Sequence, residues 1–178
     1  MESENSSHDG GKTGPARYLG IDPGLNRTGY AVFERGGRGP VLLEGGVICS
    51  TRKLSLSERV LEIGGGVREL LEQYQPAAMA IEQVFSTGQY PKTALLMAHA
   101  RGAILYAAAE CRVRVVHYTA RQIKRLLTGS GKAGKDQVQR AIRQELQLDR
   151  LLEPNDVADA AAVALCHYHV SRIALPAP

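Results

Sequence analysis

The fold class is decided by the stretch RYLGIDPGLNRTGYAVF, residues 17–33. Two runs in it, Arg17–Ile21 and Thr28–Phe33, are rich in apolar residues, and the residues between them are dense in turn formers. This pattern predicts an antiparallel hairpin. A glycine-rich stretch then leads into a third predicted strand, Val41–Cys49, so the chain is expected to begin with a three-strand meander.

Helices and strands alternate after the meander. A continuous apolar run, Ala77–Ile81, suits a strand buried on both faces, and the β-branched run Val113–His117 predicts another strand. This order predicts an α/β domain with a mixed sheet. The predicted helices are Leu54–Tyr74, whose centre is weakened by glycines, Pro91–Glu110, Ala120–Leu127, Lys135–Leu146, and a last helix from Asn155 or Asp156 to about Arg172.

Length and composition limit the classes of protein to consider. A chain of 178 residues is long enough for one domain with its own core, and 44% hydrophobic with 22% charged residues excludes wholesale disorder. No apolar run approaches the roughly 20 residues of a membrane span, so no membrane partner is expected. We expect a flexible N-terminal tail over residues 1–16, a folded domain over 17–172 and a short C-terminal tail over 173–178.

The cysteines predict neither disulfides nor a zinc site. Cys49, Cys111 and Cys166 are odd in number and form no CxxC pair, so inert thiols in a reducing cytoplasm are expected. Cys166, His167 and His169 look like a metal cluster on paper. Residues one and two apart on a helix do not face each other, however, so we expect no metal there.

Charge is unevenly distributed along the chain. The total is +4, yet the segment Arg112–Arg143 holds nine basic residues and one acid, a net +8, which leaves −4 for the rest. A strongly basic region in an otherwise acidic chain is typical of a protein that binds a polyanion. The alternative is a solvated basic surface without a ligand. The basic residues are Arg112, Arg114, Arg121, Lys124, Arg125, Lys132, Lys135, Arg140 and Arg143.

Four carboxylates occupy positions that core building alone does not explain. Asp22 ends the first strand, and Glu82 follows a buried strand, where it needs a partner to offset its desolvation. Asp156 and Asp159 are three residues apart at the start of the last helix, which places them on one face. Each has a structural alternative: Asp22 could begin the turn through an Asx hydrogen bond, and the helical pair could cap free N–H groups.

The four acids also suit a metal site. Four ionised carboxylates carry the charge that two divalent cations would balance, and oxygen ligands without cysteine favour hard ions such as Mg²⁺ or Mn²⁺. Two such ions about 4 Å apart activate water and stabilise the leaving oxygen of a phosphoryl displacement. Together with the basic segment, the acids predict a nuclease that grips a phosphate backbone.

Five segments, in order over about residues 17–172, resemble those of the bacterial RuvC Holliday-junction resolvases. Any one of them is weak evidence, but five in the same order are specific. They are Gly20-Ile21-Asp22-Pro23-Gly24 with Thr28-Gly29-Tyr30, Ala80-Ile81-Glu82-Gln83-Val84-Phe85, Ala100-Arg101-Gly102, Ala120-Arg121-Gln122-Ile123-Lys124, and Asp156-Val157-Ala158-Asp159-Ala160.

The resemblance implies a function and its residues. It implies an RNase H-like fold, a homodimer, and Mg²⁺- or Mn²⁺-dependent symmetric nicking of four-way DNA junctions in homologous recombination and DNA repair. A branch-migration complex of the RuvA and RuvB type is the implied partner in the cytoplasm. Catalytic and metal-binding roles, with two ions per site, are carried onto Asp22, Glu82, Asp156 and Asp159. DNA contacts are carried onto Phe85, Lys124 and Lys135, and the basic segment adds Arg121 and Lys132.

Two features of this reading have alternatives of their own. Phe85 follows Glu82 by three residues and leads into a glycine-containing loop, so its ring could stack on an unpaired base or could cap the core. The helix Pro91–Glu110, rich in small residues, is the expected dimer interface.

Two other function classes compete. An actin-like or sugar-kinase-like phosphotransferase also carries an Asp-x-Gly phosphate turn on its first hairpin, but it needs two such domains and a second phosphate loop. A junction-binding protein that does not cut is the third reading, and intact acids at all four positions argue against it.

Overall fold

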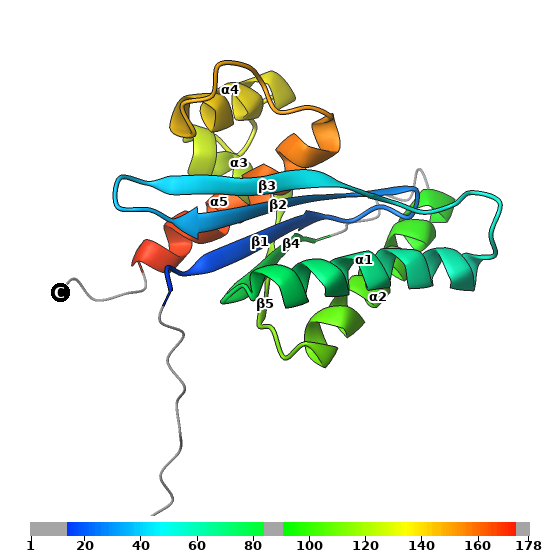
Figure 1. Ribbon diagram of the computed structural model, residues 1–178. Coiled ribbons are helices and arrows are strands. Elements are labelled where there is room, and N and C mark those ends of the chain that lie inside the picture. Colours follow the sequence, from blue (N-terminus) through cyan, green and yellow to red (C-terminus); the bar gives the residue numbers. More distant parts are fainter. Residues whose placement is uncertain (1–13, 84–90, 174–178) are drawn as a thin grey trace, which may run out of the picture.

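The computed structural model describes residues 14–83 and 91–173, which form a mixed β-sheet with helices on both faces (Figure 1). The order of the strands is β3-β2-β1-β4-β5. β1 pairs antiparallel with β2 and parallel with β4, so it lies at the centre of the sheet. The strands are β1 (Arg17–Asp22), β2 (Arg27–Arg35), β3 (Pro40–Cys49), β4 (Ala78–Glu82) and β5 (Val115–Tyr118).

The helices divide between the two faces. Leu19 and Ile21 of β1 pack with α1 and α2 in one buried cluster, whereas α3, α4 and α5 build the cluster on the other face. Figure 1 shows α1 and α2 below the sheet and α3 and α4 above it. The helices are α1 (Leu56–Tyr74), α2 (Pro91–Glu110), α3 (Ala120–Thr128), α4 (Lys135–Glu145) and α5 (Asn155–Ile173).

α5 lies unusually close to β1 and β2. Its residues 160–168 are all buried. A Cβ atom added to Gly20 would lie 2.6 Å from the Cβ of Ala164, and one added to Gly29 would overlap the carbonyl oxygen of Asp156. Real Cβ atoms do not approach other atoms so closely, so glycine at these two positions is what lets the helix lie against the sheet.

The predicted meander and the alternating elements after it are confirmed. α1 begins at Leu56, two residues later than expected, because Ser55 forms a capping box with Glu58. The glycines at 64–66 do not interrupt this helix. A Cβ on Gly66 would lie 2.8 Å from Ile48, so the small residue admits the side chain of β3.

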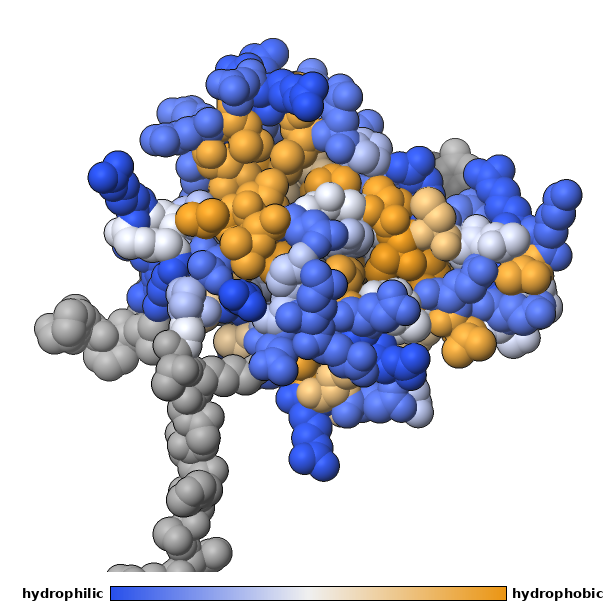
Figure 2. Space-filling view, in the orientation of Figure 1, coloured by the Kyte–Doolittle hydropathy of each residue, from blue (hydrophilic) through white to orange (hydrophobic). Residues whose placement is uncertain are grey.

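The outer strand β3 forms one edge of the sheet. Its Val41 and Leu43 are exposed, and Figure 2 shows apolar surface along this strand and toward the helices above it. Of the expected N-terminal tail, only residues 14–16 are described, and the carbonyl of Ala16 accepts a hydrogen bond from the N–H of Arg35. None of the helices in the described ranges is long and apolar enough to cross a membrane.

Candidate active site

Backbone register and the position of α5 bring the four predicted acids together at the carboxyl ends of β1 and β4. β1 and β4 are parallel with Ile21 opposite Ile81, so Asp22 and Glu82 follow at neighbouring strand ends. On the other side, Asp22 pairs with Gly29 of β2, the glycine over which α5 begins. The close approach of α5 therefore places its first turn beside the end of β1.

The electrostatic environment of Asp22 shows that the four carboxylates act on one another. Burial, followed by the charges of Asp159, Glu82 and Asp156 in that order, raises the pKa of Asp22 from 3.8 to about 7, against the opposing charge of Lys135. Burial, followed by the charge of Asp159, also raises the pKa of Glu82. A site with this much unfavourable negative charge is one that a cation would stabilise.

Two basic side chains already compensate part of this charge. The ammonium Nζ of Lys135 lies 2.8 Å from Oδ2 of Asp159, and the guanidinium Nη2 of Arg27 lies 3.0 Å from Oδ2 of Asp156. The hydrogen bond to Asp159 raises the pKa of Lys135. Each aspartate of α5 therefore has a cation in direct contact, whereas Asp22 has three carboxylates around it and the charge of Lys135 to oppose them.

A hollow of about 250 Å³ contains part of this site. Glu82, Asp159, Lys124 and Lys135 bring two acids and two cations to its wall. The remaining lining is apolar and comes from α3, α4 and α5: Ala120, Ile123, Val138 and Ala162. Lys124 lowers the pKa of Glu82, which opposes the effect of burial. The hollow thus combines carboxylates with cations that could contact phosphate.

The other predicted DNA contacts lie outside the hollow or outside the described residues. Arg121 and Lys132 are exposed and do not line it. Phe85 falls in residues 84–90, which the structure does not describe. The structure therefore places Lys124 and Lys135 beside the acids, and Arg121 and Lys132 on the surface. The contact expected for Phe85 stays a prediction.

The oxygen donors of the four acids suit a hard divalent cation, although the side chains are not arranged as the ligands of one ion. Within residues 14–83 and 91–173, no three His, Cys, Asp or Glu side chains are grouped closely enough to hold a metal. Arg27 and Lys135 bind the two aspartates instead. Carboxylate oxygens are the donors that Mg²⁺ and Mn²⁺ prefer, and burial together with the neighbouring carboxylates raises the pKa of Asp22, so a cation there would favour its ionised form.

The alternative role for Asp22, an Asx hydrogen bond that begins the turn, is weakened because other side chains hold this turn together. The hydroxyl of Thr28 donates to the carbonyl of Gly24 at 2.8 Å and accepts from the N–H of Gly24 at 3.3 Å. Arg59 of α1 then donates to the side chain of Asn26 at 2.6 Å. These contacts hold the turn, which leaves the Asp22 carboxylate for another role.

Sequence reasoning missed Arg27 and Arg59. Arg59 binds the turn from a distant helix, and Arg27 meets an acid at the other end of the chain. No local spacing signals such contacts. The only hint was a positive charge in the turn that follows Asp22.

The histidines near the chain end do not converge with Cys166. Nδ1 of His167 hydrogen-bonds with the hydroxyl of Tyr118 at 2.8 Å in the core. His169 pairs with Glu145 at 2.6 Å. Cys166 is buried, and burial raises the pKa of its thiol to about 12. These side chains serve packing and local pairing.

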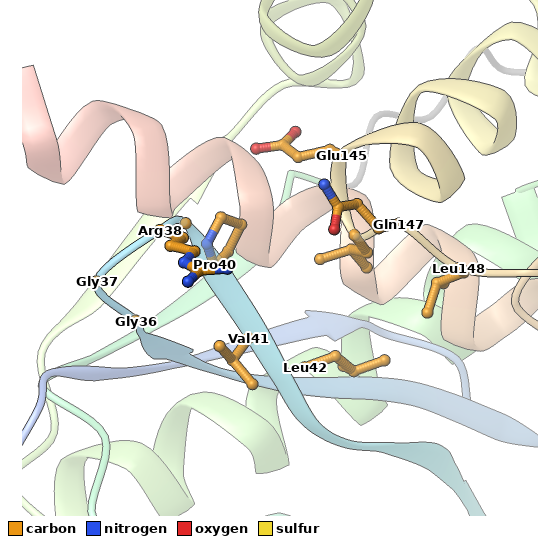
Figure 3. Close-up of a pocket in the computed structure, with 11 residues that line it drawn as sticks. Gly36, Gly37, Arg38, Pro40, Val41, Leu42, Glu145, Gln147 and Leu148 are labelled. Atoms are coloured by element: carbon orange, nitrogen blue, oxygen red, sulfur yellow. The ribbon is translucent and has the colours of Figure 1, made fainter.

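A larger hollow lies at the opposite end of the sheet. About 600 Å³ in volume, it lies between the turn joining β2 to β3 and the end of α4, as Figure 3 shows. Glu145 is its one acidic lining residue, and that side chain is paired with His169. None of the predicted site residues lines this hollow.

Comparisons with known proteins agree with the geometry. The family model described as crossover junction endodeoxyribonuclease RuvC matches residues 18–167. A RuvC of Rhodopirellula baltica is 48% identical over 154 residues, covering 86% of each chain. The structure of Thermus thermophilus RuvC in complex with a Holliday junction substrate has 35% identity and a TM-score of 0.82, covering 89% of this chain and 96% of that chain.

These matches confirm the resemblance inferred from the five segments, and the likeness to the Thermus protein confirms the RNase H-like fold. They do not favour the phosphotransferase or the non-cutting alternative. The matched residues include all four acids as well as Lys124 and Lys135. On this evidence, the chain belongs to the RuvC family of crossover junction endodeoxyribonucleases.

Proposed function

We propose that this chain resolves four-way DNA junctions by nicking two opposing strands symmetrically, in homologous recombination and DNA repair. The observation that carries the proposal is the position of Glu82, Asp156 and Asp159 close enough to Asp22 for their charges to raise its pKa, beside a hollow with two lysines. The homologous Thermus protein was solved with a Holliday junction substrate, which supports the same substrate here.

The proposed catalytic residues are the four acids. Asp22 and Glu82, at the ends of paired strands, and Asp156 and Asp159, on the first turns of α5, would hold two Mg²⁺ or Mn²⁺ ions. When bound, such ions activate water and stabilise the leaving oxygen of the phosphodiester. The carboxylates would hold the ions, while Lys135 and Lys124 would offset the charge of the approaching backbone.

The direct test is a gel assay on a synthetic four-way junction. With Mg²⁺ or Mn²⁺ we expect paired nicks at symmetric positions on opposing strands, and with EDTA we expect none. Comparing the two ions gives the metal preference. Cutting of linear duplex at the same rate, or binding without cutting in either metal, would contradict the proposal.

The basic side chains are proposed to bind the DNA backbone. Lys124 and Lys135 line the hollow with the acids, and Arg121 and Lys132 extend the positive charge over the exposed surface. Phe85, three residues after Glu82, is proposed to stack on a base opened at the crossover. The phosphate contacts proposed for the basic side chains give affinity without sequence preference.

Replacing Lys124 or Lys135 by Ala should weaken binding to all junction sequences alike. Each lost phosphate contact lowers the magnitude of the salt slope of log K by about 0.9. Fluorescence titration of labelled junctions at several salt concentrations measures the slope. Arg38→Ala is the control, since Arg38 lies in the turn at the opposite end of the sheet and should leave the slope unchanged. An unchanged slope in both lysine variants would make the basic segment a solvated surface.

A homodimer is the proposed assembly. A four-way junction has near two-fold symmetry, so two identical sites related by a C2 axis match opposing strands. α1 and α2 leave Leu61 and Tyr106 exposed at 73% and 68%, and an open hollow of about 570 Å³ lies between these helices. Large apolar side chains around such a hollow support an interface on this face, which includes the helix expected from the sequence.

Leu61→Glu should convert the dimer to a monomer. A charge buried in the interface loses its hydration without a partner, which opposes association. Analytical ultracentrifugation measures the change, and the variant should keep its far-UV circular dichroism. Val170→Glu, a similar change at an exposed helical position on α5, is the control and should remain dimeric. A parent protein that is monomeric while nicking both strands in one encounter would contradict the dimer.

The wider partners follow from the same family. We expect the enzyme to act in the cytoplasm together with a branch-migration complex of the RuvA and RuvB type.

A further inference from the structure

Arg27 is the basic residue on which a further role can be argued. It is the first residue of β2, just after the turn that follows Asp22. Its Nη2 lies 3.0 Å from Oδ2 of Asp156, with the two side chains 47% and 30% exposed. Arg27 is not part of the hollow that contains Lys124 and Lys135. It therefore contacts one of the four acids from outside that hollow.

The ion pair places a permanent positive charge on a proposed metal ligand. A guanidinium cannot lose its proton in a protein. A divalent cation approaching Asp156 would therefore meet both a repelling charge and an occupied carboxylate oxygen. Movement of the arginine side chain relieves both the repulsion and the competition for this oxygen. Because about half of that side chain is exposed, it can turn toward solvent without disturbing the core.

A DNA phosphate is the ligand that fits the displaced side chain. The guanidinium fork matches phosphate oxygens, and the phosphates of the cleaved strand must approach this edge of the sheet to reach the acids. Binding of a metal ion at Asp156 and of a phosphate at Arg27 would then strengthen each other. The metal ion takes Asp156 away from Arg27, and the phosphate takes Arg27 away from Asp156.

We propose that Arg27 is an exchangeable counter-ion of Asp156: a divalent cation displaces it, and it then binds a phosphate of the junction. The inference rests on the proposed metal site and adds a coupling between metal and DNA binding. By thermodynamic reciprocity, metal must strengthen DNA binding through Arg27 by the same factor by which DNA strengthens metal binding.

The first test measures metal binding without DNA. Full-length protein is titrated with Mn²⁺, and free Mn²⁺ is followed by electron paramagnetic resonance. Arg27→Gln should bind Mn²⁺ about three- to tenfold more tightly than the parent, since a partly exposed ion pair no longer competes. Arg17→Gln is the matched control. It breaks the ion pair of Arg17 with Glu34 at 2.9 Å and should leave Mn²⁺ affinity unchanged.

The second test measures the phosphate contact. Junction binding is titrated with salt in EDTA and in Ca²⁺, and a gel confirms that the DNA stays intact. In Ca²⁺, the salt slope of Arg27→Gln should be smaller in magnitude than that of the parent by about 0.9, the value for one phosphate contact. In EDTA the two slopes should agree, because Arg27 is then held by Asp156.

The outcomes separate this inference from the proposed function. If Asp22→Asn abolishes Mn²⁺ binding but Arg27→Gln leaves it unchanged or weaker, the metal site stands and the exchange is overturned. An equal loss of slope in EDTA and Ca²⁺ also overturns the exchange, since Arg27 would contact DNA regardless of metal. If Mn²⁺ binding does not depend on Asp22, both the inference and the metal site fail.

Discussion

The Asp22→Asn variant should lose junction cutting by several orders of magnitude while it folds at least as well as the parent. The amide keeps the shape of the side chain but removes one ligand charge, and a two-ion displacement depends on both ions. Junction binding in EDTA should be retained or strengthened, because a negative charge facing the phosphates has been removed. Glu82→Gln should lose cutting in the same way.

The stability of the same variant gives a second, independent measurement. The pKa of Asp22 is about 7 in the folded protein against 3.8 for the free group. Between these values the folded state binds more protons than the unfolded state. The contribution of Asp22 to the free energy of unfolding is therefore fully present below about pH 4 and is lost as pH rises through 7. Asparagine does not titrate, so the free energy of unfolding of the variant should rise relative to that of the parent as pH increases.

We expect the variant at pH 8 in EDTA to exceed the parent by about 1–3 kcal/mol in free energy of unfolding. For a chain of this size, each kcal/mol corresponds to about 2–4 °C in melting temperature. Calorimetry between pH 5 and 8 measures the difference. Asp149→Asn, at an exposed position after α4, is the control. An Asp22→Asn protein that melts several degrees lower and still cuts in Mg²⁺ would show that Asp22 is structural.

Gly29→Ala should disrupt the site through the backbone. The added methyl group would overlap the carbonyl oxygen of Asp156, so α5 and β2 must separate. Overpacking of this kind costs about 3 kcal/mol, and the melting temperature should fall by roughly 6–12 °C. Because Asp156 moves with the helix, cutting per folded molecule should fall about 10²-fold or more.

The control is Gly37→Ala, in the exposed turn between β2 and β3, where an added Cβ meets no atom within 4 Å. It should change the free energy of unfolding by less than about 0.5 kcal/mol. Cutting is assayed well below the melting temperature of each variant, so that loss of fold and loss of geometry are separated. Full activity in a Gly29→Ala protein of unchanged stability would contradict the close approach of α5.

Much of the fold follows from local patterns. The turn formers after Asp22 predict the hairpin, and the apolar run before Glu82 predicts a buried strand, because each signal is contained within a few residues. Once the strands are placed, the positions of Asp22 and Glu82 at one sheet edge follow from parallel pairing.

What local pattern could not predict are contacts between distant segments. The pair of Arg27 with Asp156 joins the first hairpin to the last helix. α1 continues through its glycines, and Ile48 of β3 packs where a side chain at Gly66 would lie. Helix propensity describes an isolated segment, whereas here tertiary packing decides the outcome.

The buried course of α5 has a consequence for the entropy of metal capture. Asp156 and Asp159 are attached to a backbone that is ordered when the protein folds, and Asp22 and Glu82 end strands of the central sheet. In the part of the chain that the structure describes, ion binding at the proposed site would therefore mainly order side chains, each at a cost of at most about 2 kcal/mol. Much of the order that these four carboxylates need for ion binding would therefore be supplied by folding itself, before any ion binds.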